Sequence, residues 1–190
     1  CYTQAERIAP FESLVHLNRG GILSRAGRQG EAVAACRRAV AVNPQVRDAW
    51  YNLAVCLQDQ GLFRESEPIL RRLWALVPTD SAVVGLLALA RHRASAFLEA
   101  LTLYRTVLAI HPTDETALSN HAAALFQINQ PRTAIRAYER VLRAHPTCFM
   151  ALNNMALALN RIGRADRACA VLRQALCLDP AAVDAWSNLG

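Results

Sequence analysis

Six of the eight prolines in the 190-residue chain recur at a constant interval. They are 34 residues apart, at Pro10, Pro44, Pro78, Pro112, Pro146 and Pro180. A single globular core does not require such spacing, whereas an internal repeat does. Proline cannot continue a helical hydrogen-bond ladder, and it disfavours helical geometry in the residue before it. The apolar stretches before these prolines are therefore predicted to be the ends of helices, with one stop in each repeat.

The constant interval divides the chain into repeats without any insertion. When the proline is counted as position 32, complete repeats are expected at 13–46, 47–80, 81–114, 115–148 and 149–182. Partial repeats cover 1–12 and 183–190, so that a single array is predicted over 1–190. Both ends are interpreted as cuts through a repeat, which predicts a segment of a longer array. The alternative is end-to-end self-association of two copies.

Each repeat is predicted to hold two helices joined by a tight turn. In the second repeat, apolar residues recur at helical spacing from Trp50 to Leu57, and Gly61 ends the pattern. Gly27 and Gly163 stand at the equivalent position, where glycine commonly ends a helix. First helices are expected near 13–26, 47–60, 81–93, 115–128 and 149–162. Second helices are expected near 29–42, 63–76, 97–110, 131–144 and 165–178.

Three residues depart from the average repeat. Ser95 replaces the turn glycine in the third repeat. Pro68 falls past the first turn of its expected helix, so that we expect it to kink this helix or to delay its start. Pro131, in contrast, suits the first turn of the helix that it begins.

Two positions of the repeat are always small, and a third is mostly large. Position 8 holds Gly20, Ala54, Ala88, Ala122, Ala156 and Gly190. Position 20 holds Ala32, Ser66, Ala100, Ala134 and Ala168. Position 24 holds Tyr2, Cys36, Leu70, Tyr104, Tyr138 and Leu172. Large side chains placed over small ones allow two helices to pack closely.

Over its whole length, the chain resembles the tetratricopeptide repeat family in this period, in these small positions and in the proline at position 32. The resemblance implies an all-α, right-handed superhelical solenoid of antiparallel helix pairs. First helices would line a concave face, and second helices would form the convex face. The implied function is a protein–protein interaction scaffold that holds a peptide or protein segment in the concave groove. The RNA-reading pentatricopeptide family usually has a period one residue longer and lacks this proline pattern.

Position 6, which faces the groove in this family, is asparagine in every repeat except the third, where Leu86 stands. The five residues are Asn18, Asn52, Asn120, Asn154 and Asn188. An amide can pair with both polar groups of a peptide backbone. The alternative is that these asparagines only follow the family consensus. The other residues expected in the peptide-binding groove are Tyr51, Gln58, Asp59, Arg93, Gln127 and Arg161.

The segment from Ala185 to Gly190, together with Asn153 and Asn154, resembles the repeats of O-linked N-acetylglucosamine transferases. That resemblance implies an alternative function, the substrate-recruiting arm of a larger enzyme. A third function to consider is an assembly factor of a secretion or envelope complex. The sequence beyond residue 190 would distinguish the interaction scaffold from the substrate-recruiting arm of an enzyme.

No catalytic motif, cofactor motif or metal-binding spacing occurs in the sequence, so that a non-enzymatic protein without a cofactor is expected. His111 and His145 precede repeat prolines, where imidazole suits the end of a helix. The six cysteines form no CxxC pair, which favours reduced thiols and a cytoplasmic location. No apolar run is long enough to span a membrane.

The chain contains no lysine, and its net charge of +6 comes from arginine. Many of these arginines occupy positions 25 and 26, in the second helices, and are expected to face outwards. They are Arg37, Arg38, Arg71, Arg72, Arg105, Arg140 and Arg173. This placement argues against a continuous basic groove for nucleic acid, and the expected partner is a protein or an extended peptide.

Overall fold

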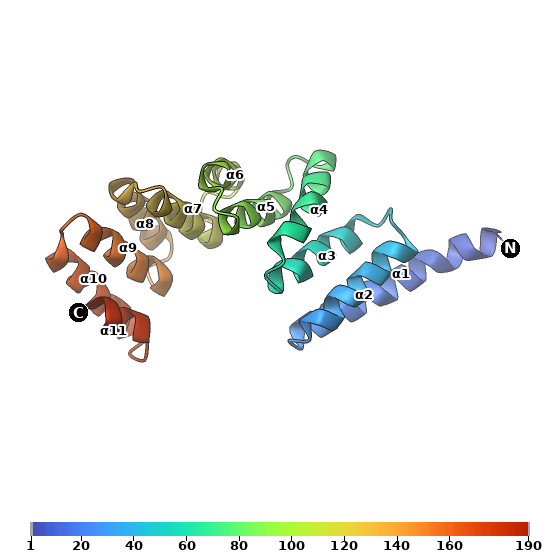
Figure 1. The fold of residues 1–190 in the computed structure, drawn as a ribbon, viewed down its shortest axis with the longest axis horizontal. Helices are drawn as coiled ribbons and strands as arrows, with labels where there is room; N and C mark the ends of the chain where they lie inside the picture. Colours follow the sequence, from blue (N-terminus) through green and yellow to red (C-terminus); the bar gives the residue numbers. More distant parts are fainter. Residues whose placement is uncertain (1, 190) are drawn as a thin grey trace. The chain divides into compact units, whose positions relative to one another are not determined.

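Residues 2–189 are described by a computed structural model, and within them the chain forms helices joined by short turns, with no strand (Figure 1). The first helices of successive pairs are α1 (Tyr2–Arg25), α3 (Arg47–Asp59), α5 (Ser81–Arg93), α7 (Glu115–Gln127), α9 (Phe149–Arg161) and α11 (Val183–Leu189). The second helices are α2 (Gln29–Val42), α4 (Phe63–Leu76), α6 (Phe97–Ile110), α8 (Pro131–Ala144) and α10 (Ala165–Leu178). The five predicted second helices are confirmed at both ends. Four of the five predicted first helices are confirmed to within one residue.

The exception is α1, because the helix stop predicted at Pro10 is wrong. This helix continues through the proline, from Tyr2 to Arg25. A proline inside a helix removes one backbone hydrogen bond and costs about 3 kcal/mol, but the bonds on either side persist. The delayed start predicted from Pro68 is also wrong, because α4 begins at Phe63 with this proline inside it.

The chain divides into two compact units, Cys1–Ala94 and Ser95–Gly190, which we call the N-terminal unit and the C-terminal unit. In the N-terminal unit, each of the helices α1 to α5 packs on the next, and α3 also contacts α1 and α5. In the C-terminal unit, α6 to α11 pack in the same way, and α9 also contacts α7 and α11. First helices of successive pairs thus lie side by side within each unit. The assignment of 34-residue repeats remains a prediction from the sequence.

The turn inside each helix pair requires one residue with positive φ. Glycine provides it three times, at Gly27 (73°), Gly61 (76°) and Gly163 (72°). The third and fourth pairs use Ser95 (61°) and Asn129 (59°) instead. Only glycine has no Cβ to clash in this conformation, so the serine and the asparagine carry a backbone cost that the glycines avoid.

Small residues at position 8 allow close packing within a pair. A Cβ atom added to Gly20 of α1 would lie 2.6 Å from the Sγ of Cys36 in α2. The equivalent residues of the later pairs have no exposed surface, and they are Ala54, Ala88, Ala122 and Ala156. The large side chains at position 24, which include Tyr104 and Tyr138, are almost fully buried. The predictions for the side chain of Tyr2 and for Gly190 lie outside the described residues.

Candidate functional site

A hollow of about 240 Å³ lies between first helices of the C-terminal unit. Its lining residues come from α7, from α9 and from the residue before α9. They are Glu115, Thr116, Ser119, Asn120, Ala123, Cys148, Met150 and Asn154. Two residues predicted for the peptide-binding groove, Asn120 and Asn154, therefore share one pocket.

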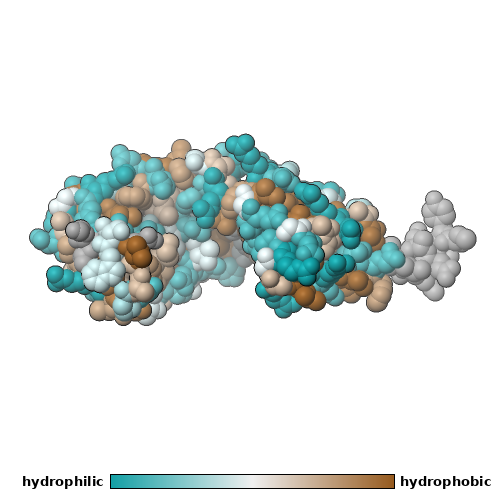
Figure 2. Space-filling view, turned by 60° about the horizontal axis from the view of Figure 1, so that its bottom comes forward, coloured by the Kyte–Doolittle hydropathy of each residue, from teal (hydrophilic) through white to brown (hydrophobic). Residues whose placement is uncertain are grey.

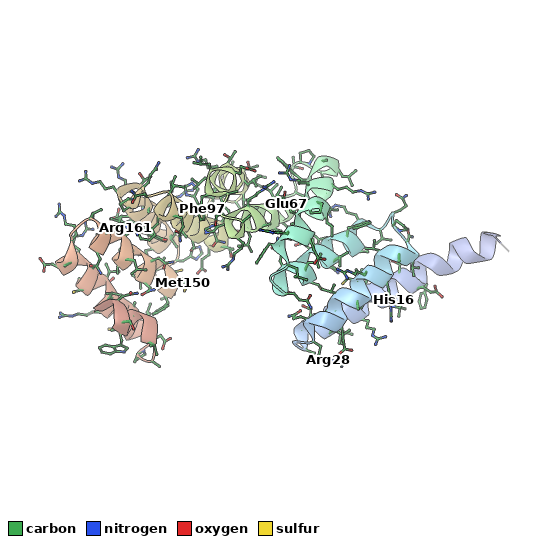
Figure 3. All side chains as sticks on the ribbon, viewed as in Figure 1. His16, Arg28, Glu67, Phe97, Met150 and Arg161 are labelled. Carbon is green, nitrogen blue, oxygen red and sulfur yellow. The ribbon has the colours of Figure 1, made fainter. Side chains whose placement is uncertain are left out.

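Helical spacing explains why these residues meet. On α7, four lining residues from Thr116 to Ala123 follow the spacing i, i+3, i+4 and i+7, which places them on one face. Met150 and Asn154 are four positions apart on α9. Since α7 and α9 contact each other, the two faces border one hollow. Figure 3 labels Met150, whose side chain is 59% exposed, and Arg161 at the end of the same helix.

Asn120 and Asn154 are both half-buried, which leaves part of each amide accessible. The side chain of Asn154 also lies beside the hydroxyl of Tyr138 in α8. Burial raises the pKa of this tyrosine, and the neighbouring amide of Asn154 partly opposes the increase. Asn154 therefore links the wall of the hollow to the core of the unit, and it has a structural contact that is not apparent from the sequence.

Glu115 and Cys148 stand at the edge of the hollow. The Nε2 atom of His145 lies 2.7 Å from the carbonyl oxygen of Thr113, so this nitrogen carries a proton and donates it. The Nδ1 atom of His145 is 3.6 Å from Oε2 of Glu115. The thiol of Cys148 lies 3.9 Å from Oγ of Ser119, and burial raises its pKa, which disfavours the reactive thiolate.

His145 and His111 follow the last residues of α8 and α6, at the helix ends where the sequence predicts them. The negative end of a helix dipole is located there. Both residues therefore occupy positions that account for them without catalysis.

Asn188 occupies the equivalent position in α11, but its amide is already paired. Its Nδ2 atom donates to Oδ1 of Asn153, at 2.9 Å. Asn153 itself is buried. The sequence pattern does not place Asn153 among the groove residues. Its contact with Asn188 becomes visible only when α9 and α11 are seen to pack together.

The N-terminal unit uses the equivalent positions differently. Asn18 is exposed and Asn52 is half-buried, and Leu86 interrupts the series on α5. Gln58 is buried, and its Nε2 donates to the carbonyl oxygen of Leu86 at 2.8 Å. The donor end of this amide therefore joins α3 to α5 and is not available to a ligand. Asp59 is exposed, and it accepts a hydrogen bond from Ser24 at 3.2 Å.

The remaining predicted groove residues have contacts of their own. Tyr51 is half-buried, and its pKa is raised by burial and by the carboxylate of Asp80. The guanidinium of Arg93 lies 5.7 Å from the ring centre of Phe63, and that of Arg161 lies 4.6 Å from the ring centre of Phe126. These are cation–π distances. Gln127 is exposed.

The part of the chain that the structure describes holds neither a metal-binding cluster nor a membrane-spanning helix. No group of three or more His, Cys, Asp or Glu side chains there could hold a metal ion. None of its helices is both long enough and apolar enough to cross a membrane. In the view of Figure 2, hydrophilic side chains cover most of the surface, with hydrophobic ones scattered among them.

Two family models match the sequence, and both carry the description tetratricopeptide repeat. One matches residues 23–90 and the other matches residues 120–183, so that together they cover more than half of the chain. No match was found among curated proteins.

Solved structures with a similar fold are numerous. A thermophilic tetratricopeptide repeat protein of Thermus thermophilus, TTC0263, is 20% identical, with a TM-score of 0.73 over 93% of this chain and 96% of that one. MamA (41-end) from Desulfovibrio magneticus RS-1 is 14% identical, with a TM-score of 0.81 over 90% and 97%. YrrB, described as a tetratricopeptide repeat protein with an unusual peptide-binding site, is 14% identical, with a TM-score of 0.75 over 98% and 96%. At these identities the similarity shows the fold alone.

Proposed function

Because the chain belongs to the tetratricopeptide repeat family, we propose that it is a non-catalytic scaffold that binds an extended protein segment along its first helices. The hollow between α7 and α9 is the proposed centre of this binding groove. The observation that carries the proposal is the presence of Asn120 and Asn154 in that one hollow.

The chemistry of the hollow suits a peptide backbone. Its lining includes two amides, two hydroxyl groups and a single carboxylate, and no arginine. An extended peptide presents one N–H donor and one carbonyl acceptor per residue, and each needs a partner when it leaves water. Side-chain amides provide both kinds of group, and hydroxyls do the same. Such a wall would hold the backbone of a segment with little dependence on its side chains.

Other groove residues are proposed to extend the contact beyond the hollow. In the C-terminal unit these are Gln127 and Arg161, and Asn188 is excluded because its amide donor is used by Asn153. For the N-terminal unit taken by itself, the proposed contact residues are Asn18, Tyr51, Asn52, Asp59 and Arg93. We leave Gln58 out of the proposed contact set, because its amide donor is used by Leu86. The peptide-binding site named for the structurally similar YrrB is consistent with this proposal.

Binding of a displayed peptide library tests the proposal. Peptides selected on the intact chain are measured against Asn120→Ala and against Asn120→Asp, which keeps the side-chain shape but removes the amide donor. We expect each variant to weaken binding about five- to tenfold, the equivalent of one hydrogen bond of roughly 1–1.4 kcal/mol. Gln174→Ala removes an exposed amide from the second helix α10 and is the matched control.

Stability must be measured in parallel with affinity. Asn154→Ala also removes the contact with Tyr138, so we expect it to lower both affinity and Tm. Affinity that is unchanged in Asn120→Ala and in Asn120→Asp would contradict the proposal. A lowered Tm with unchanged affinity would assign the asparagines to the fold alone.

A further inference from the structure

The outer side of α8 carries four arginines at regular helical spacing. They are Arg132, Arg136, Arg140 and Arg143, and all four are exposed. Intervals of three and four residues place side chains on the same face of a helix. We call these four residues the arginine stripe. The helix contains one acidic residue, Glu139, so its four arginines give it a net charge of +3.

The positive charge of the arginine stripe has no carboxylate partner among the described residues. Arg140 donates to the carbonyl oxygen of Pro112 at 3.1 Å, and Arg143 donates to the backbone oxygen of Glu139 at 3.4 Å. Both acceptors are uncharged. The carboxylate of Glu139 faces another residue, Arg167 of α10, at 3.5 Å. The stripe is therefore not neutralised within the unit.

The charge extends from α8 towards α6. His121 of α7 is affected by the charges of both Arg105 on α6 and Arg140 on α8. Burial is the main reason that its pKa is lowered, and these two guanidinium groups lower it further. Arg105 is exposed, as the stripe is. Arg105 of α6 and Arg140 of α8 therefore both act on one histidine of the helix between them.

Two arginines on second helices of the N-terminal unit, at position 25 of the repeat, are neutralised, whereas Arg38 and Arg72 share position 26 with Arg140 and have no carboxylate partner among the described residues. Arg37 lies 2.8 Å from the carboxylate of Glu65, and Arg71 lies 2.9 Å from that of Glu67. Exposed ion pairs of this kind contribute little to stability, but they cancel the local charge. The unpaired state of the stripe is therefore not a general property of arginine on second helices in this chain.

We propose that the arginine stripe is a second interaction surface, which binds an acidic helix of a partner protein. Four residues along a helix span about 6 Å, so carboxylates at the same interval on a partner helix match the stripe in register. Guanidinium groups bind carboxylates through two parallel hydrogen bonds, which gives this pairing geometric specificity. The surface lies on a second helix, whereas the proposed peptide groove lies on first helices.

Other anionic partners fit the surface less well. Helices that bind a membrane surface insert large apolar side chains, and none of the exposed large hydrophobic residues of the described chain belongs to α8. Single-stranded nucleic acid is usually held by stacking on aromatic rings, but the aromatic residue of this helix, Tyr138, is buried. An acidic helix requires only regularly spaced cations.

Fluorescence anisotropy with a labelled helical peptide tests this surface. The probe carries glutamate at every fourth position, and the comparison peptide has the same composition in scrambled order. We expect the regular peptide to bind more tightly than the scrambled one, and its affinity to fall as salt increases. The charge reversal Arg136→Glu with Arg140→Glu should weaken binding about tenfold or more.

A matched control applies the same change in charge elsewhere. Arg37→Glu with Arg71→Glu alters two exposed arginines of the N-terminal unit, and we expect it to leave the affinity within about twofold of the parent. Circular dichroism and Tm show whether each variant is folded. If the charge-reversal variant of the stripe unfolds, Arg136→Ala with Arg140→Ala is measured in its place.

Three results would overturn the proposal. The first is equal affinity for the regular and the scrambled peptide. The second is an equal loss of affinity for the acidic peptide in the stripe variant and in the N-terminal control, because such a loss would reflect net charge alone. The third is tighter binding of labelled single-stranded RNA, or of vesicles that contain phosphatidylserine, than of the acidic peptide under the same salt conditions.

Discussion

The two units are built on the same repeat positions, but they expose different surfaces. In the C-terminal unit, Asn120 and Asn154 border one hollow. In the N-terminal unit, the residue next in series after Asn52 is Leu86, and its carbonyl group is occupied by Gln58. From α2 to α10, the helices begin and end at equivalent places in both units. The fold is therefore set by the small and large core residues, whereas the proposed binding depends on a few polar residues that differ between units.

The outer helices show a second contrast of the same kind. Arg37 of α2 and Arg71 of α4 are paired with carboxylates, whereas the arginine stripe of α8, which occupies other positions of its repeat, is not. A substitution that leaves helix packing intact can therefore create or remove a charged surface. Both proposed interaction surfaces of this chain have their most distinctive residues in the C-terminal unit.

The largest expected effect comes from the core residue at position 24. Leu70→Ala in the N-terminal unit and Tyr138→Ala in the C-terminal unit each remove a fully buried side chain. We expect losses of about 2–5 kcal/mol in the free energy of unfolding. Hydrogen exchange measured by mass spectrometry should show the greatest loss of protection in the unit that carries the substitution. Equal loss in both units would contradict the division into two compact units.

A close contact in the N-terminal unit gives the next largest effect. Gly20→Ala adds a Cβ atom only 2.6 Å from the Sγ of Cys36, which is too close for a normal contact. We therefore expect the free energy of unfolding, measured by heat or urea, to fall by about 1–2 kcal/mol. Gly21 is the matched control, because a Cβ there meets no atom within 4 Å. Gly21→Ala should stabilise the helix by up to about 1 kcal/mol. If both variants behave alike, the close packing of α1 on α2 is wrong.

The turns provide a smaller and opposite effect. Ser95 has φ of 61°, which a residue with a Cβ adopts at a cost. Ser95→Gly should raise stability by about 1 kcal/mol, and Gly61→Ser should lower it by a similar amount. Asn129→Gly should change it less, since asparagine tolerates this conformation. Denaturation by urea measures all three variants, and a destabilising Ser95→Gly would refute the assigned turn.

The smallest effect concerns pH. The pKa of His121 is lowered in the folded chain, mainly by burial, so the unfolded chain binds a proton more readily. The contribution of His121 to the free energy of unfolding is fully present above the ordinary histidine pKa of about 6.5. This contribution is lost as the pH falls below that value. Because His121 is only half-buried, we expect less than about 1 kcal/mol between pH 7 and pH 5. His121→Gln should reduce this loss, and an unchanged pH profile would contradict the assignment.

Most of the helical architecture could be predicted from the regular prolines and glycines. The failure at Pro10 has a physical basis, since a proline inside a helix removes one backbone hydrogen bond while the bonds on either side persist. After Pro78 and Pro112, the side chains of Asp80 and Asp114 cap the next helix, but α3 and α9 begin after Pro44 and Pro146 without a side-chain cap hydrogen bond. Phe11 and Glu12 follow Pro10 directly and belong to the continuing α1.

The candidate site could be predicted only in part. Helical spacing places Asn120 and Asn154 on first helices, but it does not show which polar groups are already used. The amide donors of Gln58 and Asn188 are occupied by neighbours from other helices, and the sequence contains no signal of these long-range contacts. Unpaired charge on α8 likewise depends on where carboxylates of other helices lie.

The central claim, that the hollow between α7 and α9 holds an extended segment, is tested most directly by NMR. Side-chain amide signals of assigned asparagines are recorded while a library-selected peptide is added to the intact chain. We predict that the signals of Asn120 and Asn154 shift in a saturable manner and that those of the outer-surface Gln174 stay unchanged. A peptide that binds without moving the Asn120 and Asn154 signals would contradict the proposed groove.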